Sequence, residues 1–495
     1  MIETELKFRV PPERRAALQR AVATASVTKT RMRAVYFDTP QRHLAEAGMA
    51  LRLRLEGRRW VQTLKGRAGL MARAEHEVVL PAQRGEPALD PARHAAAPVG
   101  QALMALLAGH GLAAADLQVL YRTDVVRLHR LLRHRGALFE MAYDRGHLLA
   151  GEGDAERRLE VDELEIELKG GPPHALATLA ERWVARFGLW WDPRTKSEMG
   201  TRLALQQGPV PAKKAKPAGW PEEGASTALL WSQSLQSALL QTLANAAECA
   251  DGMGGAEHLH QLRVGLRRLR AALRLFAPWS ADPEAARALD AAWREPFGVL
   301  GAARDADVRA LNLTPRLAAA GAPPFDWPAT AAPPNLAAWV RDPGFHLLLL
   351  RSLALSLAPA VSERPLDDAA RELLAPAWRA IRHDAKALAD ADADTATRHR
   401  LRKRLKRLRY AFEFVQPLYP PKPARRLLAT IARALGALGD LNDCEVALAL
   451  LQPQTQVQHG AWFAVGWLSA RREVLLENAA AALGDLDDAP RPWRR

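Results

Sequence analysis

The chain of 495 residues is long enough to form two or more domains, each with its own hydrophobic core. Its net charge of +14 predicts an anionic partner, which would be a nucleic acid, an acidic surface or a polyanion. Aromatic residues make up 6% of the chain and do not alternate with basic residues, so the composition offers few platforms for stacking bases and argues against a nucleic acid.

The sequence predicts a cytoplasmic protein without a membrane span. The N-terminus is charged from Glu3 onward, which is not typical of a secretory signal. The most apolar run, residues 345–361, is interrupted by Arg351 and is short for a transmembrane helix, so it predicts a buried helix. The two cysteines, Cys249 and Cys444, form neither a disulfide framework nor a zinc pattern, which fits a reducing compartment.

Up to about residue 205, short segments of period 2 alternate with loops, which predicts β-strands. In the first segment, "MIETELKFRV", Glu3, Glu5 and Lys7 share one face and the other face is apolar. Charged residues recur with this pattern in the later segments: Arg52 and Arg54; Lys65; Arg73, Glu75 and Glu77; Arg122 and Arg127; Glu140 and Asp144; and Glu163, Glu165, Glu167 and Lys169.

These charged faces have two interpretations. In an antiparallel barrel, alternate residues of every strand point into the lumen, where carboxylates could bind divalent cations and Arg and Lys could bind phosphate oxygens. A solvated sheet with surface ion pairs explains the pattern equally well. Patterning alone does not separate the two.

The motifs of this half resemble the CYTH superfamily, the triphosphate tunnel enzymes. "ETELK" matches that family's ExExK signature, and "VYFDTP", "GMALRLR", "QTLKG", "EIELKGG" and "TKSEMG" follow in the family's order. The resemblance implies an eight-stranded antiparallel β-barrel tunnel that hydrolyses inorganic triphosphate to pyrophosphate and phosphate with Mg²⁺ or Mn²⁺. Class IV adenylate cyclases and thiamine triphosphatases share the superfamily, so a cyclase is an alternative.

The resemblance also implies roles for individual residues. The metal ligands would be Glu3, Glu5, Glu75, Glu77, Asp144, Glu165 and Glu167. The phosphate contacts would be Lys7, Arg52, Arg54, Lys65, Arg122 and Lys196, and the catalytic group would be Glu3, Glu5, Lys7 and Lys196. Two departures affect the phosphate contacts: Met199 stands where the family often has Arg, and Asp124 lies between Arg122 and Arg127.

The second half of the chain predicts a separate helical domain. Residues 206–225 are rich in Pro and Lys and lack periodicity, which predicts a linker. From residue 226 to 490, Leu and Ala recur at three- and four-residue spacing. The fold class is therefore α+β with two domains: a β-barrel tunnel over 1–205 and an all-α bundle over 226–490.

The helical half contains an internal duplication. Residues 260–276 align without gaps to residues 399–415, an offset of 139 residues from His260 to His399. Downstream, "LGAARDADV" (300–308) aligns to "LGDLNDCEV" (438–446), and both predict a turn at the end of a helix. The repeats would cover about 230–313 and 336–485. Asp305 and Asp443 could orient basic side chains through ion pairs or could cap helices.

Each repeat carries a basic stripe on one helix face, formed by His260, Arg263, Arg267 and Arg270 in the first and by His399, Arg402, Lys406 and Arg409 in the second. A surface helix normally mixes both signs of charge, and these stripes contain almost no acid, which favours a polyanion site over a solvated face. Neither histidine has a second ligand at metal-binding spacing, so their role would be to add charge at mildly acidic pH.

This half resembles the CHAD domain, an α-helical module found beside CYTH domains. The resemblance implies that the basic helices bind inorganic polyphosphate. It also implies two ways to combine the halves. The first is a triphosphatase whose helical domain holds substrate or places the enzyme on polyphosphate granules. The second is a polyphosphate-binding scaffold with a weak or inactive tunnel.

Overall fold

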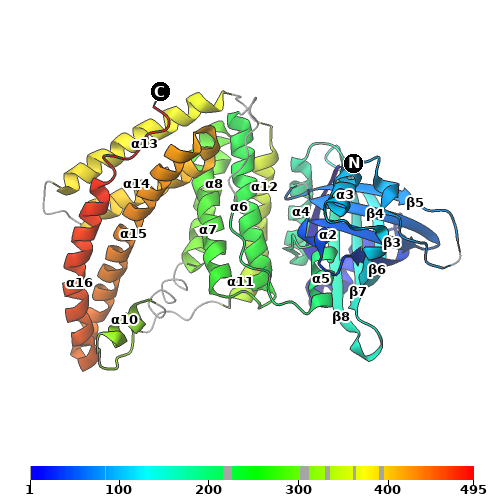
Figure 1. Cartoon of the computed structure of the whole chain (residues 1–495), viewed down its shortest axis with the longest axis horizontal. Helices are drawn as coiled ribbons and strands as arrows, with labels where there is room; N and C mark the ends of the chain where they lie inside the picture. The colour runs from blue at the N-terminus through cyan, green and yellow to red at the C-terminus, as the bar shows by residue number, and fades with distance from the viewer. Residues whose placement is uncertain are drawn as a thin grey trace. The chain divides into compact units, whose positions relative to one another are not determined.

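The computed structural model describes residues 2–67, 69–83, 85–215, 226–300, 312–328, 335–359, 364–389 and 395–494. The chain divides into two compact units (Figure 1). The first comprises Met1–Lys213, Leu240–Leu262 and Leu336–Ala358, and the second comprises Lys214–Leu239, Arg263–Asn335 and Pro359–Arg495. Part of the predicted linker, residues 216–225, lies outside the described residues, and the domain boundaries stay predictions.

One antiparallel sheet forms the centre of the first unit. Its strands are β1 (Ile2–Arg9), β2 (Thr28–Asp38), β3 (Met49–Glu56), β4 (Arg59–Arg67), β5 (Ala72–Val79), β6 (Gln118–His134), β7 (Ala137–Ala150), β8 (Arg157–Gly170) and β9 (Trp190–Trp191). Their order is β5-β4-β3-β2-β6-β7-β8-β1-β9, and β1 pairs additionally with β5 through residues 2–4 and 72–74. Eight strands therefore surround a tunnel, as predicted, with the two-residue β9 beside β1.

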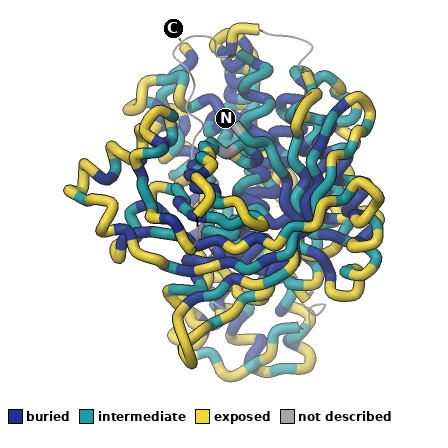
Figure 2. Tube along the Cα trace, turned by 90° about the vertical axis from the view of Figure 1, so that its right-hand side faces the viewer, coloured by how far each residue is buried: buried dark blue, intermediate teal, exposed yellow. Residues whose placement is uncertain are grey.

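The period of two separates the two faces of the strands. On β1, Leu6 and Phe8 are 1% and 0% exposed and lie on the outer face, where α4 (His174–Phe187) packs over β1 and β8. On the opposite side, Leu51 and Leu64 pack with Leu103 of α3 (Pro98–Gly109). Helices and apolar residues thus cover much of the outside, which leaves the charged faces to the inside. Figure 2 shows how buried and less buried positions follow one another along the chain.

Helical segments from the second half of the sequence complete the first unit. α6 (Thr227–Ala250) and α7 (Ala256–Leu275) enter it by their adjoining ends, together with α11 (Leu336–Arg341) and α12 (Pro343–Leu357). α12 packs against α4, and its buried His346 accepts a hydrogen bond at Nδ1 from the Trp191 backbone N–H at 3.1 Å. The buried helix predicted from the apolar run is thus confirmed as α12.

The second unit is all-α. Besides parts of α6 and α7, its described helices include α8 (Pro283–Ala292), α10 (Thr314–Ala319), α13 (Leu366–Ala389), α14 (Thr395–Val415), α15 (Pro421–Leu451) and α16 (His459–Gly484). α13 and α14 pack together, as do α15 and α16. No helix in the described part of the chain is long and apolar enough to cross a membrane.

The predicted duplication is confirmed by where the helices begin. α6, α7 and the following 3₁₀ turn begin at Thr227, Ala256 and Ala277. Their counterparts α13, α14 and a second 3₁₀ turn begin at Leu366, Thr395 and Gln416, in each case 139 residues later. Equal spacing of three consecutive elements is expected of a repeated supersecondary unit.

The predicted turn at residues 438–446 is wrong. This segment lies inside α15, because Leu438, Leu441 and Cys444 are buried along one face of a continuous helix. Its Gly439 has a helical backbone, so the glycine does not end the helix. Asp443 therefore does not cap a helix. The matching segment of the first repeat, with Asp305, lies outside the described residues.

A helix–strand contact in the first unit gives a testable prediction. A Cβ on Gly200 of α5 (Lys196–Leu205) would lie 2.2 Å from the Tyr121 ring, which is buried and stacked on Tyr36. We expect Gly200→Ala to destabilise the fold by about 1–3 kcal/mol through overpacking, although alanine favours helices. Thermal unfolding measures this.

Gly436 of α15 is the matched control, because nothing lies within 4 Å of a Cβ built there. Gly436→Ala should leave the melting temperature unchanged or raise it. Equal melting temperatures for wild type and Gly200→Ala would contradict the close contact.

Candidate functional site: a charged tunnel and a basic helix pair

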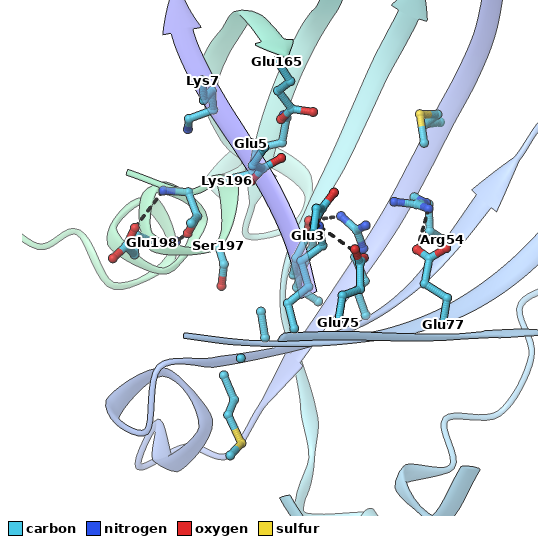
Figure 3. Close-up of a pocket in the computed structure, with 18 of the residues that line it drawn as sticks. Glu3, Glu5, Lys7, Arg54, Glu75, Glu77, Glu165, Lys196, Ser197 and Glu198 are labelled. Carbon is cyan, nitrogen blue, oxygen red and sulfur yellow. Dashed lines mark hydrogen bonds and ion pairs between the residues drawn. The ribbon is translucent and has the colours of Figure 1, made fainter. Parts of the chain in front are cut away.

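The charged faces of the strands line one cavity of about 970 Å³ (Figure 3). The structure brings together these predicted site residues on its wall: Glu3, Glu5, Lys7, Arg52, Arg54, Lys65, Glu75, Glu77, Glu165, Glu167 and Lys196. They come from β1, β3, β4, β5 and β8 and from the start of α5. Other charged residues on the wall include Arg127, Glu140 and Lys169, which belong to the charged strand faces but had no individual role, and Arg202, which the sequence had not indicated.

Lys65 joins two carboxylates of the tunnel. Its Nζ lies 2.7 Å from Glu3 Oε2 and 3.2 Å from Glu75 Oε1. Burial raises the pKa of Glu75 and the adjacent Glu3 carboxylate adds to this, so the pKa reaches about 7 despite Lys65. Burial also opposes ionisation of Glu3, but Lys65 and the hydrogen bond with Glu75 lower its pKa to about 2. Near neutral pH the two carboxylates therefore share a proton in part.

The two arginines of β3 have different partners. Arg54 Nη2 lies 2.9 Å from Glu77 Oε1, an ion pair drawn in Figure 3. Arg52 Nη1 donates to the phenol oxygen of Tyr36 at 2.9 Å, across the β2–β3 pairing in which these two residues face each other. Because Arg52 and Arg54 are two residues apart on one strand, both side chains point into the same cavity.

Lys196 is held at the start of α5 by a capping box. The Thr195 hydroxyl accepts a hydrogen bond from the Glu198 N–H at 2.9 Å, and the Glu198 carboxylate accepts one from the Thr195 N–H at 2.7 Å. Lys196 Nζ then lies 2.6 Å from Glu165, 2.9 Å from Asp144 and 2.9 Å from Glu163.

Arg127 completes this cluster. Its guanidinium binds Asp144 with two contacts of 2.7 Å and lies 2.5 Å from Glu165. Burial opposes the charge of Glu165, but Lys196 and Arg127 hold its pKa well below the usual range. Asp144, which was predicted as a metal ligand, and Glu163 are 1% and 2% exposed and are not among the residues that line the cavity. Both contact its cations from behind the wall.

Lys7 points toward the same end of the tunnel. Its Nζ donates to Glu163 Oε1 at 3.3 Å and to the backbone carbonyl of Arg194. On the β1–β8 pairing it lies opposite Glu165, and Glu5 lies opposite Glu167. The ExExK motif therefore faces the acidic motif of β8 residue by residue.

The structure does not bring Arg122 to the cavity. Its side chain is 45% exposed and lies 3.9 Å from Glu152, while Arg127 lines the wall. The two arginines are five residues apart, an odd number, so they project from opposite faces of β6. The two-residue period of a strand could therefore have predicted that only one of these two arginines faces the cavity. Asp124 pairs with Arg31 at 2.9 Å on the outer side.

Met199, which replaces the family's arginine, lies in an apolar cluster with Met32, Val125, Leu148 and Val161. An apolar residue suits this position of α5, because the cluster gives it no polar partner.

The donor atoms of the tunnel suit Mg²⁺ or Mn²⁺, since they are carboxylate oxygens. In the described part of the chain, no group of three or more His, Cys, Asp or Glu forms a preassembled metal site. Mg²⁺ needs fewer protein ligands, because it binds one or two carboxylates together with phosphate oxygens and water. The adjacent pairs Glu3–Glu75 and Glu5–Glu167 could provide such ligands.

Parts of the two basic stripes converge in the second unit. Arg263 and Arg267 of α7 lie over the Phe297 ring, 6.0 and 5.8 Å from its centre. Burial lowers the pKa of Lys406 on α14, and Arg402, Arg267 and Arg263 lower it further, to about 8 although Asp443 opposes them. Four cations therefore repel one another at a partly buried position.

The arginines at the C-terminal ends of the two stripes differ from these four cations because each has an acidic partner. Arg270 lies 2.8 Å from Asp290 and Arg409 lies 2.7 Å from Glu413, so these two cations are paired within the protein. Burial and the nearby cations Lys403, Arg402 and Lys406 lower the pKa of His399, which keeps its ring neutral at neutral pH.

Comparisons with known proteins agree with this geometry. The CYTH domain family model matches residues 1–188 and the CHAD domain model matches residues 233–452. An inorganic triphosphatase from Haemophilus influenzae is 26% identical over 212 residues, which are 41% of this chain and 56% of that protein. The chain thus spans little more than half the length of this curated relative.

Solved structures match the two halves separately. The CHAD domain from Ricinus communis is 27% identical, with a TM-score of 0.44, over 58% of this chain and 98% of that one. A putative adenylyl cyclase from Hippeastrum, described as having a dominant triphosphatase activity, is 20% identical with a TM-score of 0.27 over 40% and 94%. With both domain models matched in order, the chain belongs to the proteins that join a CYTH domain to a CHAD domain.

Proposed function

We propose that this protein hydrolyses inorganic triphosphate to pyrophosphate and phosphate in its tunnel, with Mg²⁺ or Mn²⁺, and binds inorganic polyphosphate on its helical domain. One observation carries the first part: a single cavity is lined by both carboxylates and cations from the strands around it. A substrate that is a polyanion and arrives with a divalent cation needs both kinds of group.

The ion pairs of the tunnel suit an exchange of partners. Lys65 and Lys196 each contact two or more carboxylates, and Arg54 contacts Glu77. When phosphate oxygens take these cations, the carboxylates lose their partners and become ligands for a divalent cation. A divalent cation held there would offset part of the negative charge of triphosphate, which would lower the desolvation cost of binding so highly charged a ligand.

The chain's own residues position the substrate for in-line attack. Lys7, Arg52, Arg54, Lys65, Arg127 and Lys196 would hold the phosphate oxygens and stabilise charge as the terminal phosphoryl group leaves. Glu3, Glu5, Glu75, Glu165 and Glu167 would hold the divalent cation. When bound, this cation supplies charge neutralisation and a water of lowered pKa.

The wall favours an inorganic substrate over a nucleotide. The aromatic rings on its described part are those of Tyr36, His76 and His129. Tyr36 is 5% exposed and its phenol contacts Arg52, so its ring face is not open to a base. Bases commonly stack on aromatic faces, and besides Tyr36 the described wall offers the rings of two histidines, so the cyclase is the less favoured alternative.

The converging basic stripes support polyphosphate binding. Burial, together with repulsion from Arg402, Arg267 and Arg263, lowers the pKa of Lys406 to about 8. A chain of phosphates would relieve this repulsion and would contact several cations at once. Both repeats would contribute to one site.

Replacing Glu5 by Gln should lower kcat for triphosphate about a hundredfold, because the variant keeps the shape of the side chain and removes a cation ligand. Steady-state phosphate release at several Mg²⁺ and Mn²⁺ concentrations measures this. Glu160→Gln is the matched control, since Glu160 lies on β8 but pairs with Arg15 outside the tunnel. Its kcat should equal that of wild type.

The same assay compares triphosphate, ATP, thiamine triphosphate and long polyphosphate. Faster turnover of ATP to cyclic AMP than of triphosphate would favour the cyclase. Absence of turnover with every metal and substrate would leave the polyphosphate-binding scaffold. Cleavage of long polyphosphate that is unchanged in Glu5→Gln would contradict a single tunnel mechanism.

Polyphosphate binding should weaken as the pH rises from 7 to 9. The pKa of Lys406 is lowered to about 8, so the side chain is charged at pH 7 and neutral at pH 9, and loss of one charge should raise Kd roughly fivefold. Calorimetry at constant ionic strength measures this. Lys406→Arg should give a Kd that does not change over this range. If wild type and Lys406→Arg depend on pH equally, Lys406 is not at the site.

A further inference from the structure

A buried charge cluster joins the tunnel domain to α6. Glu248 Oε1 lies 2.9 Å from Arg202 and 3.4 Å from Arg194. Arg194 also lies 2.7 Å from Asp251 and binds Asp192 with contacts of 2.9 and 2.8 Å. All five residues belong to the first unit, and Glu248 is 2% exposed.

Burial makes this cluster sensitive to the loss of any one charge. Removing one partner of a buried ion pair leaves the other in a poorly solvating environment, which costs more than the loss of a surface pair. Besides Glu248, the described contacts of the Arg202 side chain include the sulfur of Met253 at 3.3 Å, which does not compensate a charge. Arg202 therefore depends on Glu248.

The cluster is connected to two cations of the tunnel, Lys7 and Lys196, through the backbone of residues 192–196. The backbone carbonyl of Arg194 accepts a hydrogen bond from Lys7 Nζ, and the Asp192 N–H donates to the Lys7 carbonyl at 3.0 Å. Two residues further along the chain, Lys196 begins α5, and Arg202 on the same helix reaches the cavity wall itself. The segment 192–202 thus connects Glu248 to both lysines.

Two further contacts hold the chain that follows α5. His258 Nε2 lies 2.7 Å from the carbonyl oxygen of Val210, and Asn245 exchanges hydrogen bonds of 3.0 and 2.9 Å with the backbone of Lys213. Gln207 and Val210 belong to the cavity wall. α6 and the start of α7 therefore contact the chain both before and after α5.

We propose that Glu248, a residue of the CHAD domain, is a positioning residue for the tunnel. It fixes Arg194 and Arg202, and through them the segment that presents Lys7 and Lys196 to triphosphate. This inference rests on the proposed function of the tunnel and adds to it a requirement for the helical domain. A displacement of about 1 Å at such a site can lower a rate up to a hundredfold.

Glu248→Gln tests the proposal, because it keeps the shape of the side chain and removes its charge. We expect kcat for triphosphate to fall about tenfold, with KM changed less than threefold, and Glu248→Asp to recover part of the loss. Hydrogen exchange of the amides of residues 192–205 should speed up in Glu248→Gln before any substrate is added. The full chain is used throughout.

Glu181→Gln is the matched control. It removes the 3.1 Å ion pair between Arg351 of α12 and Glu181 of α4, which also joins the two domains but does not touch α5. This variant should keep the wild-type kcat and the wild-type exchange of residues 192–205.

Unchanged kcat and unchanged exchange in Glu248→Gln would overturn the proposal, as would a lower melting temperature with wild-type kcat, which indicates a role in stability alone. If wild type has no turnover, the proposed function fails. Hydrogen exchange and calorimetric binding of triphosphate then test whether Glu248 positions the tunnel residues. Faster exchange with weaker binding then supports positioning by Glu248, and wild-type values for both overturn it.

Discussion

The tunnel depends on the balance between buried charges of opposite sign. Antiparallel pairing puts the inward residues of neighbouring strands opposite each other, and here Lys7 meets Glu165 while Lys65 meets Glu75. A sheet with only carboxylates inside would repel itself, and one with only cations would do the same. The alternation of sign between strands lets a charged interior fold without a ligand and still leaves groups for both metal and phosphate.

This balance explains which side chains touch the cavity and which stand behind it. Asp144 and Glu163 are almost fully buried and hold Lys196 and Arg127 in place, while Glu165 reaches the wall. Helices cover the apolar outer positions of β1, β3, β4 and β8, so these parts of the tunnel wall have little freedom to turn a charged residue outward. Rigid walls of this kind favour a preorganised site.

Much of the tunnel could be predicted from the sequence because its signal is local. The period of two in β1 and β8 shows which residues share a face, and the same rule would have separated Arg122 from Arg127. The turn predicted at residues 438–446 failed because buried leucines at helical spacing outweigh a glycine. No pattern in the sequence indicated a role for Glu248, because its partners Arg194 and Arg202 lie about fifty residues away and only folding brings them together.

The boundary between the two sequence families is not a boundary in the folded chain. α6 and α7 belong to the CHAD match, yet their adjoining ends pack with the tunnel, and α12 covers α4. A recombination event that joined this CYTH domain to a foreign CHAD domain would separate Glu248 from its arginines and His346 from the backbone of Trp191. A substitution at either contact in one half therefore changes the surroundings of a residue in the other half, so each half constrains which residues the other can carry.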